Sequence, residues 1–122
     1  MSTLALRVSL QARSDIVDIL RYTEQKFGEN VRHRYQNLLQ AALSSLIEDP
    51  EKPGSKARNE LSAGLRSLHL AHCRQRVSSP RILKPRHIIF YRLGTKQTLE
   101  IVRILHDAME VSWHLPSADL PE

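Results

Sequence analysis

The alternation of apolar and polar residues is clearest between Arg86 and His106, where two apolar runs flank a short polar segment that contains Gly94. Two runs rich in Ile, Val, Phe and Tyr on either side of such a segment predict a β-hairpin. Both faces of each run carry large apolar side chains, which is typical of strands covered on both sides. The hairpin is therefore expected to form either the core of a small domain or the rigid floor of a functional site.

The first part of the chain predicts a strand followed by a helix. Residues Leu4–Ser9 alternate between apolar and polar, which indicates a short, half-buried strand at the edge of a sheet. Apolar residues then recur at helical spacing over Leu10–Phe27. Ser9 is suited to cap the start of this helix, and Gly28 is suited to the left-handed conformation that follows its end.

A second helix is predicted to begin at once, at Glu29 or Asn30, and to stop at Asp49 and Pro50. Its apolar positions recur at intervals of three and four residues and form a stripe about five turns long. They are Val31, Tyr35, Leu38, Leu39, Ala42, Leu43 and Leu46. Because the two helices share a connection of about two or three residues, they are expected to run antiparallel as a hairpin.

The second part of the chain predicts a loop followed by the remaining strands. The segment Asp49–Glu60 is polar and contains prolines, which indicates a linker within one domain. Gly64 marks a turn, and Leu65–Cys73 alternates as a strand. The segment Arg74–Pro85 contains two prolines and two serines and predicts a basic loop or a short irregular helix. With the hairpin, the order is strand, helix, helix and three strands.

The C-terminal segment Asp107–His114 is predicted to form a short helix, because Met109 and Trp113 lie four residues apart and could press together against the sheet. Pro116 ends this helix. The chain is expected to form a single domain over residues 1–116, followed by a frayed tail at 117–122.

At 122 residues, with 41% hydrophobic and 25% charged residues, the composition is that of one soluble globular domain. No apolar run approaches the roughly 20 residues that a transmembrane helix needs, and the apolar part of the N-terminus is too short for a secretory signal. The single Cys73 cannot form an internal disulfide. These features predict a cytoplasmic protein.

The formal net charge is +5, with a sequence pI near 9.8, and the positive charge is concentrated in one stretch. Between Leu61 and Leu99 there is no Asp or Glu, but there are eight basic residues: Arg66, Arg74, Arg76, Arg81, Lys84, Arg86, Arg92 and Lys96. Such a stretch favours an acidic partner, either nucleic acid or an acidic polypeptide. The alternative is a solvated basic face that keeps the protein soluble.

His69, His72 and Cys73 carry side chains that bind metal ions in other proteins, but their spacing argues against a metal site. On the predicted strand, His69 and His72 point to opposite faces, so they cannot bind one ion without a bulge. No metal ion or other cofactor is therefore predicted.

Four segments in order form a specific combination. They are ARSDIVDILRYTEQKFG at Ala12–Gly28, GLRSLHL at Gly64–Leu70, HIIFYR at His87–Arg92, and LEIVRILH at Leu99–His106 followed by Met109 and His114, Leu115 and Pro116. Together they resemble the ParE branch of the RelE/ParE toxins of type II toxin–antitoxin modules. The resemblance extends from about Leu4 to Pro116. The connection over Cys73–Pro85 is longer and more basic than is usual for the family.

The resemblance implies an α+β fold with an antiparallel sheet of about four strands in β-α-α-β-β-β order. The N-terminal helical hairpin would pack on one face of this sheet, and a short helix would end the domain. The resemblance also implies a bacterial cytoplasmic toxin that is neutralised by a small antitoxin, whose acidic C-terminal segment wraps over the helical hairpin and the sheet. The acid-free basic stretch would suit such an antitoxin as well as it suits nucleic acid.

Within this superfamily, ParE-like members are similar to inhibitors of DNA gyrase, and RelE-like members cut mRNA on the ribosome. A ribonuclease needs positive charge for the phosphate and usually a general acid and base for the proton transfers. The residues available for this chemistry are Arg66, Arg92, Arg103 and His106, with His87 or Tyr91 in the hairpin.

These residues are not expected to converge on one face. Arg92 lies in the opposite alternating set from Tyr91, and Arg103 lies in the opposite set from His106. No tyrosine that could serve as a general acid or base follows Tyr91 in the chain. Binding to gyrase without catalysis is therefore the favoured function. The alternatives are a metal-independent, ribosome-dependent endoribonuclease and a degenerate binding module that is no longer toxic.

Partner binding is expected to use basic and large apolar residues of the second part of the chain. The candidates are Arg66, Arg74, Arg76, Arg81, Lys84, Arg86, Arg92, Arg103, Met109 and Trp113. Three of them, Arg66, Arg92 and Arg103, have an alternative role in salt bridges at the sheet surface, for example between Arg103 and Glu60.

Overall fold

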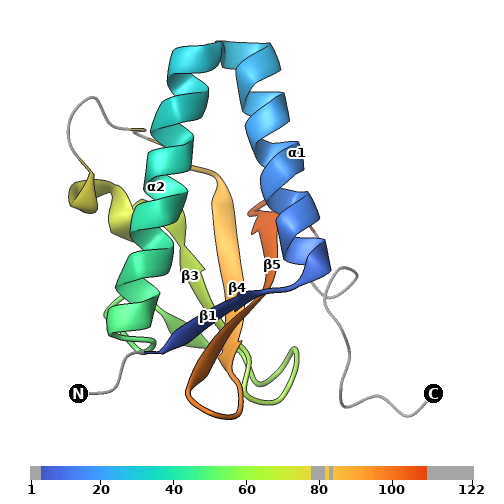
Figure 1. Ribbon diagram of the computed structural model, residues 1–122, viewed down its shortest axis with the longest axis vertical. Coiled ribbons are helices and arrows are strands. Elements are labelled where there is room, and N and C mark those ends of the chain that lie inside the picture. The colour runs from blue at the N-terminus through green and yellow to red at the C-terminus, as the bar shows by residue number, and fades with distance from the viewer. Residues whose placement is uncertain (1–3, 78–81, 83, 110–122) are drawn as a thin grey trace.

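The computed structural model describes residues 4–77, 82 and 84–109, and it has an α+β fold in which two helices cover one face of a five-stranded sheet (Figure 1). The strand order is β1-β5-β4-β3-β2. The elements are β1 (Ala5–Val8), α1 (Leu10–Phe27), α2 (Glu29–Glu48), β2 (Lys56–Ala57), β3 (Arg66–His69), the 3-10 helix η1 (Leu70–Arg76), β4 (His87–Leu93) and β5 (Thr98–His106). The predicted fold class is confirmed.

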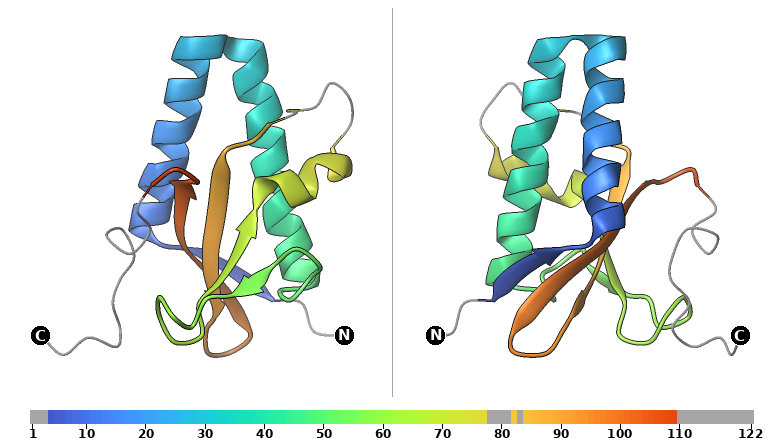
Figure 2. Two further views of the ribbon diagram at one scale, coloured as in Figure 1. Left: turned by 180° about the vertical axis from the view of Figure 1, so that it is seen from behind. Right: turned by 45° about the vertical axis from the view of Figure 1, so that its right-hand side comes forward.

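The helical hairpin begins and turns where the sequence predicts. The Ser9 hydroxyl accepts a hydrogen bond from the Ala12 backbone N–H at 3.0 Å and donates to the Val102 carbonyl at 2.8 Å, so this cap also ties α1 to β5. Gly28 has a φ of +96°, which lets the chain pass directly from α1 into α2. Figure 2 shows the two antiparallel helices standing against the sheet.

The predicted β-hairpin is also confirmed, and it contains one irregularity. Strands β4 and β5 pair antiparallel, but their register shifts by one residue between Phe90 and Tyr91. Tyr91 lies opposite Ile101, whereas Phe90 lies opposite Arg103. A bulge of this kind places one extra residue in one strand and interrupts the alternation of its side chains.

Apolar side chains of the hairpin are buried on both faces of the sheet, as predicted. The larger core lies between the sheet and the helices and includes Ile89, Tyr91, Leu99, Ile101 and Ile104. The smaller core, on the other face, consists of Leu65, Phe90, Val102 and Leu105. Simple alternation groups Leu105 with Leu99 and Ile101, and this grouping is wrong because the bulge lies between them.

The sheet differs from the predicted one in two respects. First, β1 pairs with β5 in parallel. Strands β3 and β5 share one direction because each is antiparallel to β4, and β1 runs in that same direction. Second, β2 is a strand of 2 residues inside the predicted linker Asp49–Glu60, and it pairs antiparallel with β3. Two residues are too few for alternation to predict a strand.

The predicted strand Leu65–Cys73 is wrong in its second half, because β3 ends at His69 and η1 follows. The His69 Nδ1 atom accepts a hydrogen bond from the Ala71 backbone N–H at 3.0 Å and so caps η1. Leu70 and Cys73 are three residues apart, which places them on the same side of a 3-10 helix, and both are fully buried. Burial of this pair favours the helical turns over a continued strand.

Asp15 joins α1 to β5. Its carboxylate accepts hydrogen bonds from the Arg103 guanidinium at 2.8 and 2.9 Å and from the Ile104 backbone N–H at 2.9 Å. Arg103 therefore lies in a salt bridge, but the predicted partner is wrong, because Glu60 pairs with Arg58 at 2.7 Å. Asp15 and Arg103 are 88 residues apart in the chain, a separation that no local pattern reports.

Several predictions fall outside the described residues. The structure follows the predicted C-terminal helix only as far as Met109, and residues 107–109 form a turn and bend. Arg81, Trp113 and the tail at 117–122 lie outside the described ranges. Within those ranges, no helix is both long enough and apolar enough to cross a membrane.

We expect Asp15→Ala to lower the free energy of unfolding by about 2 kcal/mol, because it removes the carboxylate that pairs with the largely buried Arg103 guanidinium and accepts from the Ile104 backbone N–H. Urea denaturation followed by circular dichroism measures the change. The matched control is Asp18→Ala, on the exposed side of the same helix, which should change stability by less than about 0.5 kcal/mol. Equal losses in the two variants would show that Asp15 does not hold α1 on the sheet.

Candidate functional site

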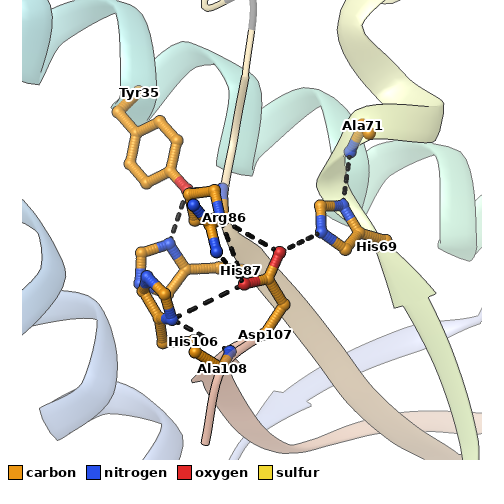
Figure 3. Close-up of polar contacts among 8 residues, drawn as sticks. All are labelled: Tyr35, His69, Ala71, Arg86, His87, His106, Asp107 and Ala108. Atoms are coloured by element: carbon orange, nitrogen blue, oxygen red, sulfur yellow. Dashed lines mark hydrogen bonds and ion pairs between the residues drawn. The ribbon is translucent and has the colours of Figure 1, made fainter.

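Titratable side chains converge at the end of the sheet where β4 begins and β5 ends (Figure 3). His87 and His106 are register partners, and their ring centroids are 5.4 Å apart. Tyr35 reaches them from α2, and Asp107 directly follows β5. We call this set the histidine cluster; it comprises Tyr35, His69, Arg86, His87, His106 and Asp107.

Tyr35 and His87 share a short hydrogen bond, with 2.5 Å between the tyrosine hydroxyl and the His87 Nδ1 atom. The Arg86 backbone N–H donates to the same hydroxyl at 3.2 Å, so the tyrosine proton is directed to His87. Burial raises the pKa of Tyr35 to about 12. Burial, and then the neighbouring His106, lower the pKa of His87 to about 4. Both side chains are therefore neutral at pH 7.

Asp107 is the anion of the cluster. Its carboxylate accepts hydrogen bonds from the Arg86 guanidinium at 2.9 to 3.2 Å. The His69 Nδ1 atom accepts from the Ala71 N–H, so the neutral ring carries its proton on Nε2 and donates it to Asp107 at 2.9 Å. The hydrogen bond from Arg86 is the main cause that lowers the pKa of Asp107 to about 2. The negative charge of Asp107 is thus satisfied inside the cluster.

His106 is accessible to a ligand, since 40% of its side-chain surface is exposed. Its Nδ1 atom accepts a hydrogen bond from the Ala108 backbone N–H at 3.0 Å. In the neutral ring this nitrogen carries no proton, so its 3.6 Å contact with Asp107 becomes a salt bridge only when the ring is protonated.

A cleft of about 340 Å³ opens beside the cluster, and we call it the hairpin-tip cleft. The tip of the helical hairpin supplies Tyr22, Thr23, Lys26, Phe27 and Val31; the segment before β4 supplies Ile82, Lys84 and Arg86; and the rest of the lining is Tyr35, His87 and His106. No Asp or Glu of the described chain lines it. The cleft therefore combines apolar walls with positive charge.

The structure does not bring the four predicted ribonuclease residues together. Arg66 donates to the Ser55 hydroxyl at 2.7 Å, at the β2 side of the sheet. The Arg92 Nε atom lies 3.9 Å from a carboxylate oxygen of Glu100 on β5. Arg103, also on β5, pairs with Asp15 of α1. Only His106 belongs to the histidine cluster.

The predicted partner-binding residues are dispersed over several elements. Arg74 and Arg76 lie in η1, where Arg76 pairs with the last residue of α2 at 3.2 Å. Lys84 and Arg86 line the hairpin-tip cleft. Met109, at the end of the described chain, is 42% exposed.

The expectation that the polar groups of the hairpin do not converge is wrong at this end of the sheet. His87 and His106 lie at the outer ends of two strands that pair antiparallel, which is a signal that the sequence contains. The contact made by Tyr35 cannot be predicted in this way, because the residue belongs to the apolar stripe of its helix and the sequence does not indicate what its hydroxyl meets. Asp107 falls in the segment predicted as the C-terminal helix, and its contacts with His69 and Arg86 follow from the tertiary structure.

The potential metal ligands His69, His72 and Cys73 do not all lie on one strand, contrary to the prediction from the sequence. His72 lies in η1, with its ring packed against Gly54, and not on the face of a strand. Cys73 is fully buried. Across residues 4–77, 82 and 84–109, no group of at least three His, Cys, Asp or Glu side chains is placed to hold a metal ion.

Comparison with known proteins identifies the family. A family model described as the ParE toxin of the type II toxin–antitoxin system parDE matches residues 6–111. The chain belongs to the ParE toxin family. This ParE-family toxin is 33% identical over 109 residues to Toxin ParE1 of Caulobacter vibrioides, across 89% of this chain and 95% of the relative. The resemblance found in the sequence is confirmed.

A solved structure supports the same fold. The ParE-family toxin matches a chain in the crystal structure of the E. coli DinJ–YafQ toxin–antitoxin complex with a TM-score of 0.55 and 20% sequence identity. The match covers 88% of this chain and 96% of the other. At this identity the likeness concerns the arrangement of helices and strands.

We expect Asp107→Asn to destabilise the toxin at neutral pH, by less than Asp15→Ala, because Asp107 is more exposed. The lowered pKa of Asp107 means that its stabilising effect is complete above pH 4 and is lost as the pH falls toward 2. The difference in unfolding free energy between wild type and variant should therefore shrink over that range. Asp18→Asn is the control. A difference that stays constant from pH 5 to pH 2 would contradict the assigned role of Asp107.

Proposed function

We propose that this ParE-family toxin acts by binding DNA gyrase and blocking or trapping it, and that a cognate antitoxin neutralises it. The observation that carries the proposal is the burial of the hydrogen-bonded Tyr35–His87 pair. A general acid and a general base work best when their pKa values lie near the operating pH. The pKa of His87 is about 4 and that of Tyr35 is about 12, so neither pKa lies near pH 7.

The arginines support the same proposal. A ribonuclease would direct a guanidinium at the scissile phosphate. Arg86 is already bound to Asp107, Arg103 to Asp15, and Arg92 lies beside a carboxylate of the neighbouring strand. Each of these guanidinium groups faces a carboxylate of the protein, and they are not presented together to one phosphate.

One observation favours the second candidate, a ribosome-dependent endoribonuclease. His106 is exposed beside the hairpin-tip cleft, and Lys26 and Lys84 line the same cleft. An accessible imidazole near two ammonium groups could move a proton beside a bound phosphate. We rank this candidate second because burial lowers the pKa of His87, the register partner of His106, to about 4, which is too low for a general acid or base at pH 7.

The family itself supports an antitoxin as partner, since its description names a toxin–antitoxin system. The net charge of +5 and the acid-free stretch from Leu61 to Leu99 suit a partner with an acidic segment. In the structural relative, a toxin is in complex with its antitoxin.

Purified toxin at micromolar concentration is expected to inhibit DNA supercoiling by gyrase or to cause gyrase-dependent DNA breaks. The variant His106→Ala should retain this effect, because the proposed action does not need proton transfer. Agarose gel assays of plasmid topology measure both proteins.

A different combination of results would favour the ribonuclease. If gyrase activity is unchanged, and induced toxin instead leaves mRNAs cut within codons in a manner that His106→Ala abolishes, the protein is a ribonuclease. That outcome would replace the proposed function with the second candidate.

A further inference from the structure

The two histidines that line the hairpin-tip cleft, His87 and His106, each offer a hydrogen-bond donor. The His87 Nδ1 atom accepts from the Tyr35 hydroxyl at 2.5 Å. The His106 Nδ1 atom accepts from the Ala108 backbone N–H at 3.0 Å. In the neutral rings the proton therefore lies on Nε2. Within the described part of the chain neither Nε2 atom makes a hydrogen bond, so both Nε2–H groups are available to an acceptor that enters the cleft.

Positive charge lies in the same cleft, and the protein does not neutralise it. Lys26 and Lys84 belong to the lining, whereas no Asp or Glu of the described residues does. The Lys26 ammonium lies 5.7 Å from the centre of the Tyr22 ring, and neither lysine pairs with a carboxylate of the described chain. Asp107, the anion of the histidine cluster, is already bound by Arg86. The electrostatic field in the cleft therefore favours an anion.

Aromatic surface borders these donors and charges. Tyr22 is 56% exposed and Phe27 is 59% exposed, although both belong to the lining. Val31 and Ile82 add branched aliphatic groups to it. Exposed aromatic rings offer a face on which a flat ring of a ligand can stack. The cleft volume of about 340 Å³ lies at the lower end of the range for small-molecule sites, so it suits a ligand of about the size of a mononucleotide.

We propose that the hairpin-tip cleft binds a small phosphomonoester that carries an aromatic ring. The phosphate oxygens accept hydrogen bonds from the two imidazole Nε2–H groups, and Lys26 or Lys84 balances the negative charge. The aromatic ring of the ligand stacks on Tyr22 or Phe27. This binding does not depend on whether gyrase is the target of the toxin, because the ligand is a small molecule and every group that contacts it lines the cleft.

A phosphomonoester matches the cleft better than a carboxylate or a nucleic-acid strand does. At pH 7 it carries a charge of about −2 and presents three acceptor oxygens, so it can bind both imidazoles and an ammonium group at once. A carboxylate presents only two oxygens and a single charge. A phosphodiester within a strand also carries a single charge, and a run of nucleotides does not fit into about 340 Å³.

The test uses adenosine 5′-monophosphate as the probe and three comparison compounds. Adenosine lacks the phosphate, glutarate carries two carboxylates, and the dinucleotide ApA has a phosphodiester but no terminal phosphate. Binding to the full-length toxin is followed by two-dimensional ¹⁵N–¹H NMR of the backbone amides and of the histidine ring nitrogens. With the monophosphate we expect saturable shifts of cleft amides and of the His87 and His106 Nε2 signals. Each comparison compound should bind at least about tenfold more weakly.

Variants distinguish this cleft from general attraction of an anion to a basic protein. The double variant with Lys26→Ala and Lys84→Ala should bind the monophosphate about tenfold more weakly, whereas Lys56→Ala, on the exposed edge strand β2, should leave its affinity unchanged. Phe27→Ala should also weaken binding, because it removes aromatic surface from the cleft. Leu10→Ala, at the opposite end of α1 and 81% exposed, should not weaken it.

Three results would overturn the proposal. They are no saturable shift of cleft signals with the monophosphate, an affinity for the monophosphate that the lysine double variant retains, and a comparison compound that binds as tightly as the monophosphate. Tight binding of ApA would assign the cleft to nucleic acid, and tight binding of glutarate would assign it to a carboxylate ligand. Gyrase inhibition measured on the same preparations reports separately on the proposed function.

Discussion

The register of the β4–β5 hairpin is the constraint on which the rest of the structure depends. These strands are neighbours at the centre of the sheet, with β1 beyond β5 and β3 beyond β4. A slip of one residue would turn the buried side chains of either strand to the opposite face. The bulge between Phe90 and Tyr91 sets how the two faces are divided. In β5 it leaves Ile101 and Ile104 on the side of the helices and Val102 and Leu105 in the smaller core on the other side.

The same register creates the histidine cluster. It makes His87 and His106 neighbours, and the packing of α2 on the sheet covers His87 with Tyr35. Burial then determines the chemistry, because it disfavours the charged forms of both the imidazole and the phenol. Asp107, which follows β5, is held by Arg86 and is satisfied locally. In this ParE-family toxin the cluster therefore stabilises the end of the sheet and forms one wall of an open cleft.

Much of the fold could be predicted from the sequence, because the signals are local. Ser9 and Gly28 mark the ends of α1 through capping and a positive φ, and the alternation in β4 and β5 reports burial on two faces. The 3-10 helix η1 could not be predicted in this way. Its residues alternate as a strand would, and only the burial of Leu70 and Cys73 against the rest of the core favours the tighter turns.

The site was less predictable, for a physical reason. Its interactions join Tyr35 to His87, 52 residues apart, and His69 to Asp107, 38 residues apart. Such contacts arise from tertiary packing, and the pKa values that decide their chemistry arise from burial. The pairing of His87 with His106 is the exception, since the ends of an antiparallel hairpin meet.

The proposed non-catalytic function depends on the buried Tyr35–His87 pair being unsuited to proton transfer at pH 7. The most direct measurement is the titration of the His87 imidazole, followed by the ¹³C and ¹⁵N chemical shifts of its ring. We expect His87 to remain neutral from pH 7 to below pH 5, with a pKa of about 4. A pKa near the ordinary value of about 6.5 would contradict the non-catalytic function, because the ring would then be poised for proton transfer at physiological pH.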